Sequence, residues 1–241
     1  ILISTDTIFG TIGGGNLEYL VIDEARKLIH NNTANKVMNI PLGPGIGQCC
    51  GGYVQVKLSL HNNSKDALKN ENVVNNIKPN LVIFGSGHIG QALISKLENI
   101  NFNTFIIDSR EDYLKMTNIK DINYLLSKKP WEIVSKLEDN SYFLVLTHSH
   151  DYDLKILNEI LKKNNTFVGL IGSLTKKKRF YKRLIDNGHN KSIVEKIECP
   201  IGIDIGNSKD PNEIAFSIIT RIISIKNKLK HLSNNKIKEV I

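Results

Sequence analysis

The chain has 241 residues, 41% of them hydrophobic and 23% charged, which is ordinary for a globular protein with one or two domains. No apolar run approaches the ~18–20 residues of a membrane helix, so we expect no stable membrane insertion. The net charge of +8 comes with lysines along the whole chain and without the aromatic and basic clusters of nucleic-acid-binding proteins, so we interpret it as solvated surface.

The cysteines and the first residues bear on the compartment. Three cysteines, an odd number, argue against a disulfide framework and for a reducing, cytoplasmic environment. The opening "ILISTDTIFG" has no Met, no basic region and no cleavage site of a signal peptide. We therefore expect a cytoplasmic protein whose sequence is truncated at its start, inside a strand.

The first predicted domain is a small α/β unit covering residues 1–61. Hydrophobic residues recur at helical spacing over 16–29, and they alternate with polar residues over 53–60 as in a half-buried strand. The stretch "GTIGGGNLEY" precedes the helix, where Asn16 is a candidate N-cap and Glu18 places a carboxylate near the loop. Its glycines form either a tight turn or part of an anion cradle; they are Gly13, Gly14 and Gly15.

A second glycine-rich loop in this domain, "GPGIGQCCGGY", carries adjacent cysteines. Neighbouring cysteines rarely form a disulfide with each other, and glycines let a ligand approach the backbone closely. Thiolates are soft ligands suited to molybdenum, copper or zinc, or to carrying sulfur. The candidate cofactor contacts are Gln48, Cys49, Cys50 and Gly51, and the two thiols are the candidate metal contacts.

The polar residues 62–79 are expected to be a linker to a second domain, residues 80–226, followed by a basic C-terminal tail, residues 227–241. Pro211 and Glu213 are placed to begin the last helix of this domain. Short apolar runs alternate with helical patterns, which predicts a Rossmann-like parallel sheet with helices on both faces. The runs lie at 81–84, 103–108, 122–126, 142–146 and 167–171.

The stretch "LVIFGSGHIGQALISKL" places a glycine motif between a predicted strand and a predicted helix. Gly85, Gly87 and Gly90 have the G-x-G-x-x-G spacing, which allows a tight turn, a close backbone approach and helix–strand packing. Asp108 ends the next strand, where it can accept hydrogen bonds from a ribose, which favours NAD over NADP. The nearby Arg110 makes this preference weaker. The motif indicates a Rossmann fold and leaves open whether a dinucleotide is bound.

Three further strand ends carry candidate contacts. In "THSHDYD", His148 and His150 follow a buried strand, where one histidine could cap the next helix or both could contact substrate, cofactor or metal. In "GLIGSLTKKKR", Gly172 and Ser173 could cap a helix with a basic first turn. This helix start could bind a phosphate, or its basic residues could form a solvated surface. Asp204, in "CPIGIDIG", is a candidate carboxylate.

Together, these motifs resemble those of the xanthine dehydrogenase accessory factor family (XdhC/CoxI-type). "GTIGGGNLEY" and "GQCCGG" are similar to its N-terminal signatures, and "VIFGSGHIG", with His88, "THSHDYD", "GLIGS" and "PIGIDIG" are similar to its Rossmann domain. The family's opening helix and first glycine-containing motif are missing, and many members have Cys where this chain has Asn16.

The resemblance implies a cofactor-binding maturation factor rather than an enzyme that turns over a free substrate. Such a protein binds molybdenum cofactor (molybdopterin), supports its sulfuration and inserts it into a molybdenum hydroxylase of the xanthine dehydrogenase type. It implies a homodimer and a cysteine desulfurase as a further partner. Two alternatives remain: an NAD-dependent oxidoreductase in which His148 or His150 moves a proton, and an interaction module that senses a dinucleotide.

Overall fold

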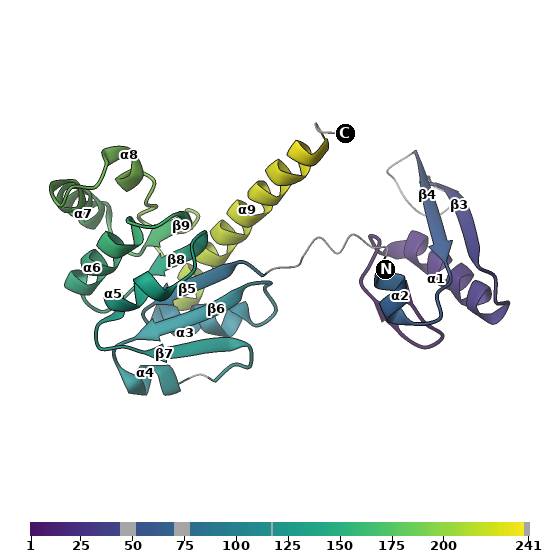
Figure 1. The fold of residues 1–241 in the computed structure, drawn as a ribbon, viewed down its shortest axis with the longest axis horizontal. Helices are drawn as coiled ribbons and strands as arrows, with labels where there is room; N and C mark the ends of the chain where they lie inside the picture. The colour runs from purple at the N-terminus through teal and green to yellow at the C-terminus, as the bar shows by residue number, and fades with distance from the viewer. Residues whose placement is uncertain (44–51, 70–77, 117, 239–241) are drawn as a thin grey trace. The chain divides into compact units, whose positions relative to one another are not determined.

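The computed structural model describes residues 1–43, 52–69, 78–116 and 118–238 of the chain (Figure 1). The chain divides into two compact units, Ile1–Asn76 and Ile77–Ile241. The division falls within the polar segment 62–79, but the part of that predicted linker at Ser64–Lys69 is a helix of the first unit. In the described part of the chain, no helix is both long and apolar enough to cross a membrane.

The smaller unit packs a helix against a pair of antiparallel strands. Its core consists of the apolar face of α1 with one residue from β3 and one from β4, Ile40 and Leu58. The helix predicted over 16–29 and the strand predicted over 53–60 are both present. The elements are β1 (Leu2–Ile3), β2 (Ile8–Phe9), α1 (Gly15–His30), β3 (Asn35–Pro41), β4 (Tyr53–Ser59) and α2 (Ser64–Lys69).

The larger unit contains a five-stranded parallel sheet in the order β7-β6-β5-β8-β9. All five predicted apolar runs are strands, because each run is short, apolar and bounded by polar or glycine residues. The strands are β5 (Asn80–Phe84), β6 (Asn103–Asp108), β7 (Ile122–Leu126), β8 (Ser141–Val145) and β9 (Asn165–Leu170).

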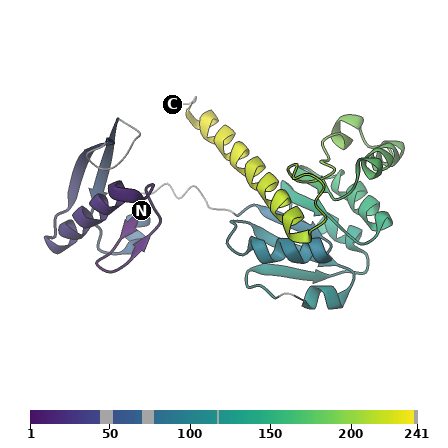
Figure 2. The ribbon, with the colours of Figure 1, turned by 180° about the vertical axis from the view of Figure 1, so that it is seen from behind.

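Helices cover both faces of this sheet (Figures 1 and 2). Successive side chains of a strand point to opposite faces, so Leu81 and Ile83 pack with α3 and α9, whereas Val82 and Phe84 pack with α6 and α7. The helices are α3 (His88–Leu97), α4 (Glu111–Lys115), α5 (Pro130–Ile133), the 3-10 helix η2 (Val134–Lys136), α6 (His150–Ile160), α7 (Leu174–Asp186), α8 (Lys191–Val194) and α9 (Pro211–Lys238).

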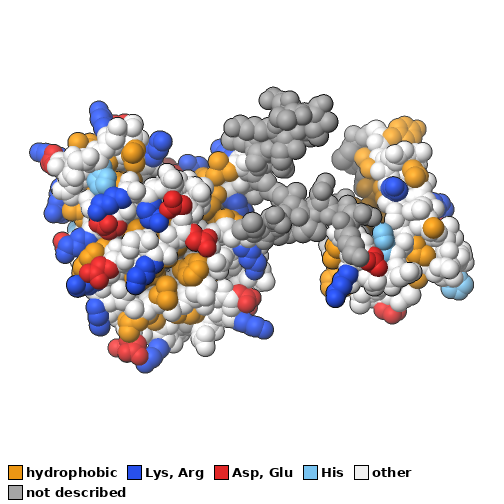
Figure 3. Space-filling view, in the orientation of Figure 1, with side chains coloured by type: hydrophobic (Ala, Val, Ile, Leu, Met, Phe, Trp, Pro, Cys, Tyr) orange, Lys and Arg blue, Asp and Glu red, His pale blue; other side chains and the backbone are white. Residues whose placement is uncertain are grey.

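The last helix begins where the sequence predicts and continues further. Pro211 is its first residue, and Asp210 accepts hydrogen bonds from the amides of Asn212 (2.7 Å) and Glu213 (3.2 Å). The helix continues through residues 227–238, the stretch expected to be a basic tail. Figure 3 shows Lys and Arg side chains spread over the visible face of the larger unit with carboxylates among them, as expected for solvated surface.

Candidate functional site

The strand order reverses between β5 and β8, and ligands of open α/β sheets bind at the carboxyl ends of the strands at such a point. Gly85 follows β5 with a φ of +113°, and a Cβ there would lie 2.3 Å from the carbonyl oxygen of Leu146. A Cβ at Gly90 would lie 2.2 Å from the carbonyl oxygen of Gly85. Packing therefore requires both glycines, as the motif predicts.

Gly87 differs from these two glycines because its surroundings are open. The nearest heavy atom to a Cβ at Gly87 would be Nη2 of Arg110, at 4.0 Å. Gly87 is the N-cap of α3, and the first N–H groups of a helix have no acceptor within the helix. The backbone at Gly87 and His88 can therefore approach an anion closely, with a guanidinium beside it.

Asp108 is almost fully buried, and its carboxylate accepts hydrogen bonds from groups of the chain itself. Oδ2 accepts from the Ser86 amide (2.7 Å) and from Nη2 of Arg110 (2.8 Å), and Oδ1 accepts from the Arg110 amide and Nε, both at 3.0 Å. Burial alone would raise the pKa of this carboxyl, but the hydrogen bonds from Arg110 and from the amides hold that pKa below its ordinary value. The acceptor positions predicted for a ribose are thus occupied by donors of the chain.

Arg110 is held over the glycine loop from two sides. Its guanidinium pairs with Asp108 and also lies 3.8 Å from the centroid of the Tyr113 ring, in a cation–π contact. The hydrogen bonds to Asp108 raise the pKa of Arg110, so the guanidinium stays charged. Ser86 Oγ and Gln91 Nε2 donate to the Tyr113 carbonyl oxygen, at 3.0 and 2.6 Å, which ties α4 to the loop. Sequence reasoning gave Arg110 a minor role and missed Tyr113.

A second polar cluster follows β8 and β9. The fully buried Asp153 of α6 accepts hydrogen bonds from the Thr147 amide (3.0 Å) and hydroxyl (2.7 Å), and from Nζ of Lys176 (2.6 Å). Lys176 also donates to the carbonyl oxygen of Ile171 at 2.9 Å. The ion pair thus joins the starts of α6 and α7 to the ends of β8 and β9. The sequence showed Lys176 only as one member of a basic run.

Gly172 and Ser173 explain how Lys176 turns inward. Ser173 is the N-cap of α7 and accepts a hydrogen bond from the Lys176 amide at 3.2 Å, so the predicted cap is confirmed. A Cβ at Gly172 would lie 2.4 Å from Cδ of Lys176, so this position needs glycine for the lysine to fold back. The neighbouring Lys178 and Arg179 are exposed.

His148 and His150 lie exposed at the same edge of the sheet. The His148 ring contacts Tyr152 edge-on at 5.5 Å, and the His150 ring contacts Phe180 edge-on at 6.1 Å. The alternative in which a histidine caps α6 was wrong, because the N-cap is Ser149. Its hydroxyl oxygen accepts a hydrogen bond from the Tyr152 amide at 3.4 Å.

Two further predicted contacts of the larger unit are Asp204 and His88. Asp204 is exposed in the loop before α9 and accepts a hydrogen bond from the Gly206 amide at 2.9 Å. His88, the first residue of α3, lines a pocket of about 420 Å³ beside the glycine loop. Asp204 thus stabilises its own turn, whereas His88 lies beside Gly87 at the start of α3.

In the smaller unit, Glu18 organises the first glycine loop. Its Oε2 accepts hydrogen bonds from the Thr11 hydroxyl, from the Ile12 amide (2.9 Å) and from the Gly14 amide (3.2 Å), and the Thr11 and Ile12 bonds lower its pKa. The predicted cap at Asn16 was wrong, because the helix begins at Gly15 and this residue lies in the first turn. The loop glycines have the positive φ values that a tight turn, one of the two alternatives, requires: they are +121° at Gly13, +74° at Gly14 and +66° at Gly15.

The paired thiols cannot be placed in this arrangement. Gln48, Cys49, Cys50 and Gly51 lie outside the described residues. Within the ranges that the structure does describe, no three His, Cys, Asp or Glu side chains form a group that could hold a metal ion. Metal contact by Cys49 and Cys50 therefore stays a prediction.

Comparison with known proteins identifies relatives along most of the chain. The uncharacterized protein YqeB of Escherichia coli (strain K12) is 25% identical over 230 residues, which are 92% of this chain and 39% of that protein. A probable xanthine dehydrogenase subunit of Bacillus subtilis (strain 168) is 27% identical over 154 residues, 63% of this chain and 44% of that protein. The chain therefore spans less than half the length of these relatives.

A solved structure shares the fold. The crystal structure of a xanthine dehydrogenase from Bacillus halodurans matches with a TM-score of 0.67 at 18% identity, covering 91% of this chain and 83% of that one. The XdhC Rossmann domain family matches residues 81–222. This range contains the five strands of the parallel sheet, except Asn80 at the start of β5, and the first part of α9. Because this match covers more than half of the 241 residues, the chain belongs to the XdhC Rossmann domain family.

Proposed function

We propose that this chain is an accessory protein that binds molybdenum cofactor, supports its sulfuration and delivers it to a molybdenum hydroxylase of the xanthine dehydrogenase type. Family membership and a relative named as a xanthine dehydrogenase subunit support an association with such an enzyme. The proposed partners are that hydroxylase, a cysteine desulfurase as the sulfur source, and a second copy of the chain in a homodimer.

One observation carries the choice of ligand: the carboxylate of Asp108 is saturated by four donors of the chain itself. An NAD-binding site uses this carboxylate to accept from the ribose hydroxyls, and here that would require breaking the pair with Arg110. The guanidinium beside the open Gly87 instead favours a phosphate. The geometry therefore favours a ligand that presents a phosphate to this loop without needing Asp108 to accept from ribose hydroxyls, as NAD does.

The residues of the loop fit the phosphate end of molybdenum cofactor. The amides at Gly87 and His88 would donate to the phosphate, and the N–H groups of Arg110 that do not face Asp108 would donate beside them. When bound, the cofactor supplies a molybdenum centre that the client enzyme uses. The chain's own contribution is to bind and orient the cofactor, with Cys49 and Cys50 proposed as its soft ligands.

The test is anaerobic co-elution of purified molybdenum cofactor with the chain, followed by molybdenum content. We expect retention by the wild type and at least a tenfold loss of affinity in Arg110→Gln. Arg183→Gln, the same change at an exposed arginine of α7, is the matched control and should retain the cofactor. The double variant Cys49→Ala/Cys50→Ala tests the thiols separately.

Two results would overturn the proposal. One is a wild-type chain that retains no cofactor, and the other is turnover of NADH with a small substrate that Asp108→Ala abolishes. The second result would instead establish the oxidoreductase alternative. Binding of NAD without turnover would favour the dinucleotide-sensing module.

A further inference from the structure

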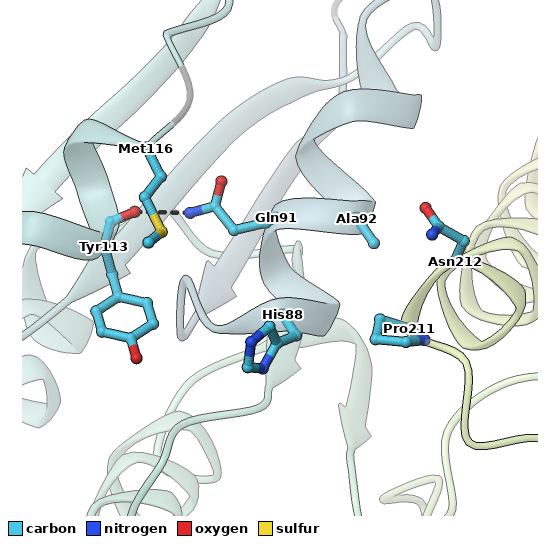
Figure 4. A pocket seen from close by; sticks show the side chains of 7 residues that line it. All are labelled: His88, Gln91, Ala92, Tyr113, Met116, Pro211 and Asn212. Carbon is cyan, nitrogen blue, oxygen red and sulfur yellow. Dashed lines mark hydrogen bonds between the residues drawn. The ribbon is translucent and has the colours of Figure 1, made fainter.

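A pocket of about 420 Å³ opens between the N-terminal half of α3, α4 with the residue that follows it, and the first turn of α9 (Figure 4). Ligand sites commonly span about 300–1,000 Å³, so this volume suits one fused ring system rather than a whole dinucleotide. The seven lining residues are His88, Gln91, Ala92, Tyr113, Met116, Pro211 and Asn212.

The walls combine apolar surface with neutral hydrogen-bonding groups. None of the seven lining residues that the structure describes is Lys, Arg, Asp or Glu, so the pocket does not offer a phosphate a charged partner. Tyr113, Met116 and Pro211 supply apolar surface, and Asn212 supplies an exposed amide. Such a lining fits a planar, uncharged nitrogen heterocycle, which stacks on apolar surface and hydrogen-bonds at its edge.

Two of the polar side chains are held in place by their neighbours. Nε2 of Gln91 donates to the carbonyl oxygen of Tyr113 (2.6 Å) and to that of Ser86 (3.0 Å). Oδ1 of Asn212 accepts from Nζ of Lys96 at 2.6 Å, which directs the amide NH₂ group away from the lysine. Gln91 therefore fixes the Tyr113 wall of the pocket, and the oriented NH₂ group of Asn212 is the amide that can bind a ring edge with little loss of freedom.

The pocket adjoins the anion position of the glycine loop. His88 directly follows Gly87, and the Tyr113 ring that lines the pocket carries the Arg110 guanidinium at 3.8 Å from its centroid. Groups that can bind a phosphate, at Gly87 and Arg110, therefore lie next to the uncharged walls of the pocket. We propose that the pocket binds the fused nitrogen heterocycle of a ligand whose phosphate sits at the glycine loop.

This inference rests on the proposed function for one of its two ligand sources. A fused heterocycle bearing a phosphate can be the pterin of molybdenum cofactor or a purine nucleotide. Both present a flat ring with amide-like edges to the pocket and a phosphomonoester to Arg110. The pocket predicts that the ring contributes affinity beyond that of the phosphate alone.

The experiment measures binding to the full chain by calorimetry with three probes. The probes are inorganic phosphate, guanosine 5′-monophosphate, and the phosphorylated pterin released from molybdenum cofactor by oxidation. Asn212→Trp fills the pocket from an exposed position in the first turn of α9, and Thr220→Trp places the same bulk at an exposed position on that helix outside the pocket. Circular dichroism checks that both variants are folded.

We expect at least one ring-bearing probe to bind the wild type tenfold or more tightly than phosphate. Asn212→Trp should remove that gain and leave phosphate binding unchanged, whereas Thr220→Trp should leave all affinities unchanged. Arg110→Gln should weaken every probe that binds. His88→Leu, a second pocket variant, should weaken ring-bearing probes without weakening phosphate by a similar factor.

The outcomes separate the pocket from the proposed function. If Asn212→Trp and His88→Leu leave pterin binding unchanged, the proposed ring-binding role of the pocket is overturned and the cofactor proposal stands. Pocket-dependent binding of guanosine 5′-monophosphate without any pterin binding would support the pocket and count against the cofactor proposal. Ring-bearing probes that bind no more tightly than phosphate would overturn the pocket.

Discussion

The ion pair between Lys176 and Asp153 offers the sharpest test of how the larger unit is held together. Asp153 is fully buried, and the Lys176 side chain is 9% exposed. Lys176→Met keeps much of the side-chain volume but removes the 2.6 Å contact with Asp153 and the 2.9 Å hydrogen bond to Ile171. Thr147 still donates to Oδ1, while Oδ2 loses its charged donor.

Breaking a buried pair by removing one partner typically costs about 3–5 kcal/mol, because the remaining charge is left uncompensated. We expect Lys176→Met to lower the free energy of unfolding of this unit by about 3 kcal/mol or more. Lys178→Met, an exposed change on the same helix, should stay within about 0.5 kcal/mol of the wild type. Asp153→Asn combined with Lys176→Met should recover part of the loss, since the charge is then absent.

The assay is urea unfolding followed by tryptophan fluorescence. The chain has one tryptophan, and Trp131 lies in the larger unit at 5.1 Å from the Tyr152 ring of α6, so the signal reports this unit. A loss in Lys176→Met no larger than in Lys178→Met would refute the reasoning. It would mean that Asp153 finds water or another donor once the lysine is gone.

Three further predictions concern the glycine loops. Gly90→Ala should cost about 3 kcal/mol or prevent folding, since the new Cβ would lie 2.2 Å from a backbone oxygen; normal unfolding by fluorescence would contradict this. The Asp108 pKa lies below its ordinary value of 3.8, so its stabilisation is present above that pH and is lost as pH falls through the folded pKa. Asp108→Asn should therefore reduce the fall in the free energy of unfolding as the pH drops below 4. Urea unfolding at a series of pH values would count against this if that free energy fell equally steeply with pH in the variant and the wild type. Glu18→Ala should speed hydrogen exchange at the Ile12 amide at least tenfold, and unchanged protection would show that another group holds the loop.

The sequence by itself determined the strands of the larger unit. Short apolar runs predict its strands because a buried parallel strand needs apolar side chains on both faces, and all of them are present. The roles of Gly85 and Gly90 followed from spacing, because a turn from strand to helix restricts the backbone locally. The cap at Ser173 was also readable, since its acceptor and donor lie three residues apart.

Capping was less predictable where several polar residues compete within one turn. Near α6, two histidines, a serine and two aspartates are adjacent in sequence, and the backbone places Ser149 at the N-cap. Near α1, three consecutive glycines let the helix start before Asn16. Both errors are shifts of one or two residues, which is the usual uncertainty of a helix boundary.

Only the tertiary structure decided which side chains meet across the sheet edge. The sequence places the carboxylate of Asp108 at the right strand end with Arg110 two residues away, but the structure adds the Ser86 amide from the preceding strand–helix turn, and together these donors turn a predicted ribose acceptor into an internal ion pair. Lys176 stands in a basic run and becomes buried because Gly172 leaves room for it beside Asp153. Periodicity reports which face of an element is buried, whereas the identity of a polar partner depends on contacts between segments distant in the chain.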